Sequence, residues 1–108
     1  MINIDVLRQL ALRFPDTTEE PHFEKISFRV NKKIFATFDE KNDREVVKLS
    51  LTDQSVFCSF DKAIMYPVKG TWGGQGWTVV ELNKVKRAML KDALKSAYQN
   101  VAVKKKKN

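Results

Sequence analysis

Apolar residues recur at α-helical spacing near both ends of the chain. In the first stretch they return every three or four positions between Asn3, a suitable N-cap, and Pro15, which ends the pattern. The second stretch predicts a long helix over residues 84–99 with Asn83 as its N-cap. Its apolar face consists of Val85, Met89, Leu90, Ala93, Leu94, Ala97 and Tyr98. Each helix therefore has one face to bury against another layer.

The region between these helices alternates apolar and polar residues, as strands do. Residues 25–30 and 34–38 carry this alternation on either side of a turn at 31–33, which predicts a β-hairpin. Further strands are predicted at residues 46–51, 63–68 and 77–82.

Two shorter segments separate the predicted elements. Residues 16–22 are polar and contain a proline, which predicts a loop. Residues 52–60 predict a short helix. Its expected N-cap is Thr52 or Asp53. The residues expected to face inward are Val56, Phe57 and Phe60.

This order of elements predicts the α+β class, with a mainly antiparallel sheet covered on one face by an N-terminal and a long C-terminal helix. The chain is of the size of one domain, which we place at residues 1–103. Residues 104–108 form a basic tail that we expect to be disordered, because four consecutive lysines repel one another.

Three of the four glycines lie between the two tryptophans, Trp72 and Trp77. The stretch does not match a phosphate-binding loop, because Gly70 and Gly76 are six positions apart and a tryptophan stands where lysine is required. A strand also follows it, where a nucleotide fingerprint needs a helix. The glycines thus predict a hairpin turn, after which Trp77 begins a strand with its ring inward.

The residue inventory argues against catalysis and cofactors. The single cysteine excludes an internal disulfide and a multi-cysteine zinc site. With one histidine besides, few residues are left that could form a nucleophilic triad. Cys58 sits among apolar residues and is interpreted as a core residue. We therefore expect a non-enzymatic protein without cofactor or metal. With no apolar run of about 20 residues and no signal-peptide pattern, we expect a cytoplasmic location without membrane contact.

The charge is distributed unevenly along the chain. The net charge is +7, yet residues 1–61 hold nine basic and eleven acidic side chains, whereas residues 62–108 hold eleven basic and two acidic ones. One strongly positive half suggests a polyanionic partner, most often nucleic acid, although a plain solvated basic surface has the same signature.

Three features could together form one positive surface that binds nucleic acid. They are a basic stripe on the long helix, the tip of the first hairpin and the glycine-rich turn. The candidate residues are Lys84, Arg87, Lys91 and Lys95; Lys32 and Lys33; and Lys69, Trp72 and Gln75. Trp72 would stack on a base or insert into a groove, or else pack against the edge of the core. Sequence preference should be weak, because few residues at these turns suit bidentate base contacts, and Gln75 is the best candidate among them.

The order of short motifs resembles the MmcQ/YjbR family of small bacterial proteins, over the chain to about residue 103. The matching residues are Pro21 with Phe23, residues 31–38, Lys48 to Ser50, Trp77 with Val79 and Leu82, and Tyr98 with Val101. The family's Ser-Tyr pair is Ala97-Tyr98 here, and His22 stands where an aromatic residue is common.

The resemblance implies a fold similar to the frataxin and secretion-chaperone group, and DNA binding through a double-wing motif. The wings would be the hairpins around residues 31–33 and 70–76. Two alternatives remain: a protein-interaction or chaperone-like module, and a small-molecule pocket formed by His22, Lys48, Trp77 and Tyr98. We expect a monomer.

Overall fold

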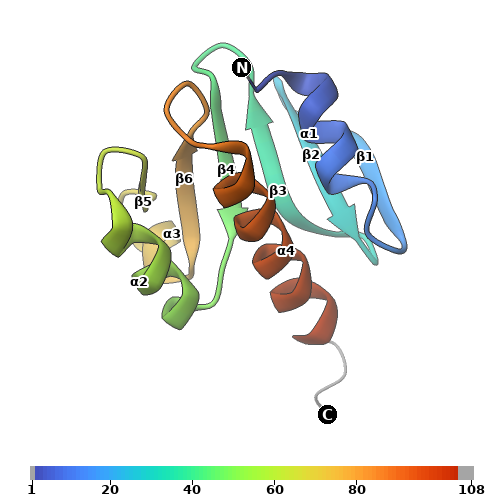
Figure 1. Ribbon diagram of the computed structural model, residues 1–108. Helices are drawn as coiled ribbons and strands as arrows, with labels where there is room; N and C mark the ends of the chain where they lie inside the picture. Colours follow the sequence, from blue (N-terminus) through green and yellow to red (C-terminus); the bar gives the residue numbers. More distant parts are fainter. Residues whose placement is uncertain (1, 105–108) are drawn as a thin grey trace.

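The computed structural model describes residues 2–104, and it contains a six-stranded antiparallel sheet with helices on one face (Figure 1). The strand order is β1-β2-β3-β4-β6-β5. The elements are α1 Ile4–Ala11, β1 Thr17–His22, β2 Lys25–Val30, β3 Lys33–Asp39, β4 Arg44–Lys48, α2 Leu51–Phe60, β5 Met65–Pro67, α3 Thr71–Gly74, β6 Trp77–Glu81 and α4 Arg87–Lys104. The predicted α+β class is confirmed.

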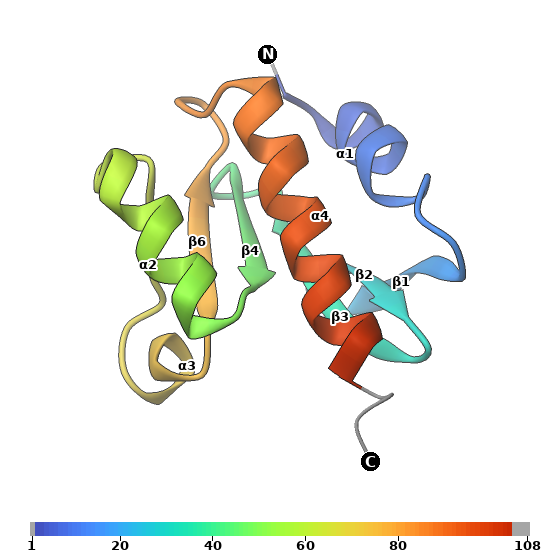
Figure 2. The same ribbon diagram turned by 60° about the horizontal axis from the view of Figure 1, so that its bottom comes forward.

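The core lies between the sheet and the layer formed by α1, α4 and α2 (Figures 1 and 2). Phe28 and Phe35 from the sheet are fully buried, as are Leu90 and Leu94 from α4. Within residues 2–104, none of the helices is both long and apolar enough to span a lipid bilayer.

One ionisable side chain lies in this core. Glu45 of β4 is fully buried and pairs across the sheet with Phe38 on one side and Val80 on the other. Neither of its carboxylate oxygens has a hydrogen-bond partner among the described residues. Burial raises the pKa of Glu45 well above its usual value, since the charged form loses its hydration.

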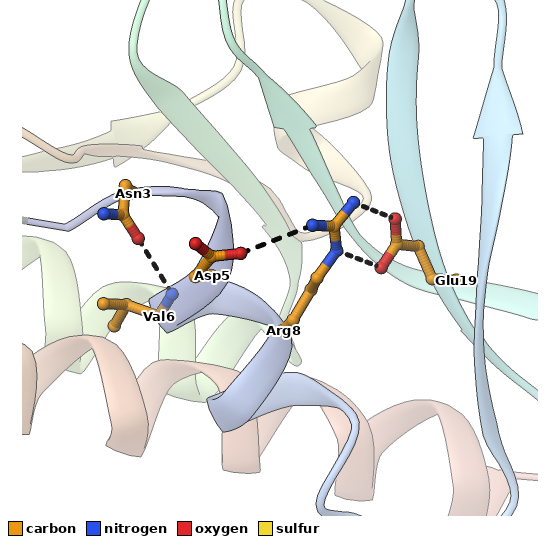
Figure 3. Close-up of polar contacts among 5 residues, drawn as sticks. All are labelled: Asn3, Asp5, Val6, Arg8 and Glu19. Atoms are coloured by element: carbon orange, nitrogen blue, oxygen red, sulfur yellow. Dashed lines mark hydrogen bonds and ion pairs between the residues drawn. The ribbon is translucent and has the colours of Figure 1, made fainter.

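The N-terminal helix α1 is fixed at its start and to the sheet (Figure 3). The Asn3 side chain accepts a hydrogen bond from the Val6 amide at 3.0 Å, which confirms the predicted N-cap. Arg8 donates to both carboxylate oxygens of Glu19 in β1, at 2.7 and 2.9 Å, and approaches Asp5 at 3.5 Å. This forked contact joins α1 to the first edge strand.

The prediction of a loop at residues 16–22 is wrong, because Thr17–His22 forms β1 and pairs with β2 along its whole length. The segment lacks the apolar alternation of a half-buried strand. It lies at the sheet edge, where only one neighbour pairs with it, so an edge strand tolerates its proline and its charged residues.

The short helix α2 differs from its prediction at both its cap and its faces. Ser50 is the N-cap, with its hydroxyl accepting from the Asp53 amide at 3.1 Å, so the preceding strand ends at Lys48. Val56 and Phe60 are 52% and 66% exposed, contrary to the inward orientation expected of them. Phe57 and Cys58 are the partly buried residues that pack against the core.

The long helix α4 begins three residues later than predicted and ends five residues later. Asn83 is therefore not its N-cap, because a turn with hydrogen bonds from Lys84 and Val85 to Glu81 precedes the helix. Lys104, assigned to the tail from the sequence, is the last residue of α4. The rest of the predicted tail, residues 105–108, lies outside the described residues.

Candidate nucleic-acid interface

Both predicted wings lie at the same end of the sheet, which Figure 2 turns toward the viewer. All neighbouring strands are antiparallel, so the β2–β3 turn and the connection from β5 through α3 to β6 emerge on the same side. Lys48 ends β4 between them, opposite Trp77. We call this region the wing end: residues 31–33, Lys48 and residues 69–76.

The β2–β3 turn holds two successive residues in the left-handed backbone region. Asn31 has φ 53° and Lys32 has φ 71°, the pattern of a type I′ turn, which normally has glycine at the second position. Lys32 therefore stands where a side chain is energetically unfavourable. Both Lys32 and Lys33 are exposed.

Glycines fit the other wing closely against the strands. Gly70 and Gly76 have φ 79° and 104°, and a Cβ on Gly76 would lie 1.9 Å from the carbonyl oxygen of Leu49. A Cβ on Gly73 would lie 1.9 Å from the Val68 carbonyl oxygen. The stretch thus reverses the chain between two antiparallel strands, as predicted, with one added helical turn, α3.

The buried side chain of Gln54 holds this wing from the helix side of the sheet. Its amide nitrogen donates to the carbonyl oxygen of Gly73 at 3.0 Å and to the Thr78 hydroxyl at 3.1 Å. Sequence reasoning missed Gln54. The available signal was its position three residues before Phe57, a spacing that places both side chains on the same, inward face of the short helix.

On the sheet face opposite the helices lies a groove of about 410 Å³. Its floor is formed by strand residues whose side chains point away from the core, together with the ring of Trp72 on α3. The lining residues are His22, Lys25, Ile34, Thr37, Val46, Val68, Trp72 and Trp77. We call it the open-face groove.

The two tryptophans line this groove, contrary to the inward ring predicted for Trp77. Thr78 and Val80 point into the core, so Trp77 alternates onto the open face, where it is partly exposed. The Lys48 ammonium lies 5.4 Å from the centroid of the Trp77 ring and donates to the Gln75 carbonyl oxygen at 2.6 Å. Trp72 on α3 is 61% exposed, and Gln75 and Lys69 are also exposed.

The structure brings together only part of the predicted pocket. His22 and Trp77 line the groove, and Lys48 contacts Trp77. Tyr98 lies on the other side of the sheet, where its ring stacks on Phe14 at 4.7 Å and its hydroxyl donates to the Pro15 carbonyl. The register that separates these residues is set by strand pairing, which single motifs do not reveal.

The predicted positive surface is divided in two. The helix residues Lys84, Arg87, Lys91 and Lys95 are exposed on the helix layer or just before α4. With 18 residues, α4 is about 27 Å long, and it begins at the end of the domain opposite the wing end (Figure 1). Lys32, Lys33, Lys69, Trp72 and Gln75 therefore form a group separate from Lys84 and Arg87.

The chain forms a small α+β domain whose antiparallel sheet is open on one face. Its two turns, between β2 and β3 and between β5 and β6, lie at the same end of the sheet. The family model named YjbR matches residues 12–100, and the chain belongs to the YjbR family. The crystal structure of Deinococcus radiodurans protein DR2400, described with the domain DUF419, is similar at 21% identity with a TM-score of 0.82. The match covers 94% of this chain and 80% of that one. No curated protein matches the sequence.

Proposed function

We propose that the chain binds DNA through the wing end, without an enzymatic step. The observation that carries the proposal is that two lysine-bearing turns project from the same end of one sheet. They are three strand spacings apart, roughly 14 Å, which is comparable with the major groove width of about 12 Å. The two turns can thus contact the phosphates that border one groove.

The charge at the wing end supports this orientation. Lys32, Lys33 and Lys69 are exposed at the two turns, and Lys48 lies between them. Phosphate contacts of this kind supply most of the affinity of non-specific binding. Few residues there are suited to bidentate base contacts, and Gln75 is the best candidate, so we expect weak sequence preference.

Replacing Lys32 with glycine and Lys33 with threonine should weaken duplex DNA binding without loss of stability. Glycine suits the left-handed conformation of Lys32, and threonine suits the first position of a strand. Two lost phosphate contacts should make the slope of log affinity against log salt less steep by about 2. Fluorescence anisotropy of a labelled duplex at several salt concentrations measures this slope.

The matched control is Lys84→Ala/Lys86→Ala, which removes the same charge at the opposite end. It should leave affinity and slope nearly unchanged. An equal loss in both double variants would mean that only the overall charge attracts DNA, and the wing end would then have no special role.

A further inference from the structure

We propose that the open-face groove stacks unpaired bases, so that the preferred DNA carries a single-stranded segment. This inference rests on the proposed DNA binding at the wing end and names the class of DNA recognised there.

The groove has the size and the lining of a binding site for a flat apolar group. Its volume of about 410 Å³ falls within the ~300–1,000 Å³ of sites for small ligands. Ile34, Val46 and Val68 form an apolar floor, with Trp72 and Trp77 at the wing end. A nucleobase with its sugar matches this combination of flat apolar surface and aromatic border.

Trp72 is exposed on a rigid support. Trp72 is 61% exposed, while the helix that carries it is fixed by the close approach of Gly73 to Val68 and by the hydrogen bond from Gln54. A large ring left in water on a firmly held element gains most when a second flat group covers it. The backbone of α3 would lose little conformational freedom on binding because it is already held.

The charges around the groove complement a phosphate backbone. Lys25 lies at one end of the groove, and Lys48 lies against Trp77 at the other. No acidic residue is among the described groove-lining residues. Three acids elsewhere on this face have polar partners: Glu81 accepts from Arg44 at 3.0 Å and from Tyr66, Glu20 lies 3.9 Å from Arg29, and Asp39 accepts from Asn42. Glu24 and Glu40 lie beyond Lys25, in the hollow next to the end of the groove away from the tryptophans.

A paired base cannot use this site. In a duplex both ring faces are covered by neighbouring bases, whereas an unpaired base can place one face on Trp72. The groove opens at the wing end, because Trp72 belongs to both. A strand that leaves a duplex held at the two turns would therefore reach the groove directly.

The test compares two labelled oligonucleotides of equal length and charge: oligothymidylate of about 12 nucleotides, within the ~4–16 covered by a single-strand-binding OB-fold, and its abasic counterpart. The wild-type chain should bind oligothymidylate about tenfold more tightly. Trp72→Ala should abolish this preference, and Trp72→Phe should keep most of it. The control Phe60→Ala removes an equally exposed ring from α2 and should change nothing. Thermal unfolding of each variant confirms that it folds.

Equal affinity of the wild type for both oligonucleotides would overturn the inference, as would a preference for oligothymidylate that survives Trp72→Ala. The inference would also be overturned by a small aromatic acid that binds the groove without competing with DNA. Such a compound would quench the fluorescence of the tryptophans and leave bound oligothymidylate in place. The proposed DNA binding is tested separately by the duplex titration, which contains no unpaired base. If Lys32→Gly/Lys33→Thr weakens duplex binding while the base preference is absent, DNA binding stands and the groove inference fails.

Discussion

Gly76→Ala is expected to lower the free energy of unfolding by about 3–5 kcal/mol. The new Cβ would lie 1.9 Å from the Leu49 carbonyl oxygen, and the backbone has φ 104°, a conformation that side chains rarely adopt. The clash involves backbone on both sides, so no side-chain rotation can relieve it. Guanidinium unfolding measures the loss, and DNA binding should fall with it because Gly76 positions α3 and Trp72.

Gly74→Ala is the matched control in the same turn. A Cβ on Gly74 would meet nothing within 4 Å, so alanine should be neutral or stabilising by ~0.4–1 kcal/mol through its smaller unfolded-state entropy. Equal destabilisation by both substitutions would show that the wing depends on glycine flexibility and not on the contact with Leu49.

Glu45→Met is expected to raise the free energy of unfolding at pH 8 by about 1–3 kcal/mol. Glu45 is fully buried, both its oxygens lack partners among the described residues, and burial raises its pKa well above the usual value. Methionine has a similar length and adapts to the surrounding apolar side chains.

The gain should depend on pH in a defined direction. Below about pH 4.3, the ordinary pKa of glutamate, the carboxyl is neutral in both the folded and unfolded states. As pH rises above that value, the unfolded chain releases the proton while the folded chain retains it, so the wild type loses stability until the raised pKa is passed. The difference between Glu45→Met and wild type should therefore grow from pH 4 to pH 8.

Urea unfolding at pH 4, 6 and 8 tests this dependence. The control Glu40→Gln changes an exposed carboxyl on the neighbouring turn and should change the free energy of unfolding little. A Glu45→Met difference that stays constant with pH would mean that Glu45 is ionised, and hydrated or paired, in the folded protein.

Elements with one strongly apolar face could be predicted from the sequence. The first helix, the hairpin around residues 31–33 and the strand at 77–81 all exist, because periodicity reports directly which face is buried. The edge strand β1 gave no such signal, since pairing on one side and an ion pair from Arg8 hold it in place. The faces of α2 were also mispredicted, because an apolar residue on a helix can remain exposed when no other layer covers it.

The candidate interface was predictable as separate parts but not as a surface. Lysines and glycines identified the two turns, since turn chemistry is local. The open-face groove requires the register of five strands, and Trp77 moves to the opposite face with a shift of one residue. The separation of Lys84 and Arg87 from the wings likewise follows from the direction of α4, which composition does not encode.

The two edges of the sheet affect how copies of this protein can meet. At one edge β5 has three residues and ends at Pro67, which cannot donate a backbone hydrogen bond. At the other, β1 carries Glu19, Glu20 and Pro21. Neither edge is a good template for an incoming strand. Neighbouring copies of the chain should therefore remain separate domains and should not join into a continuous sheet.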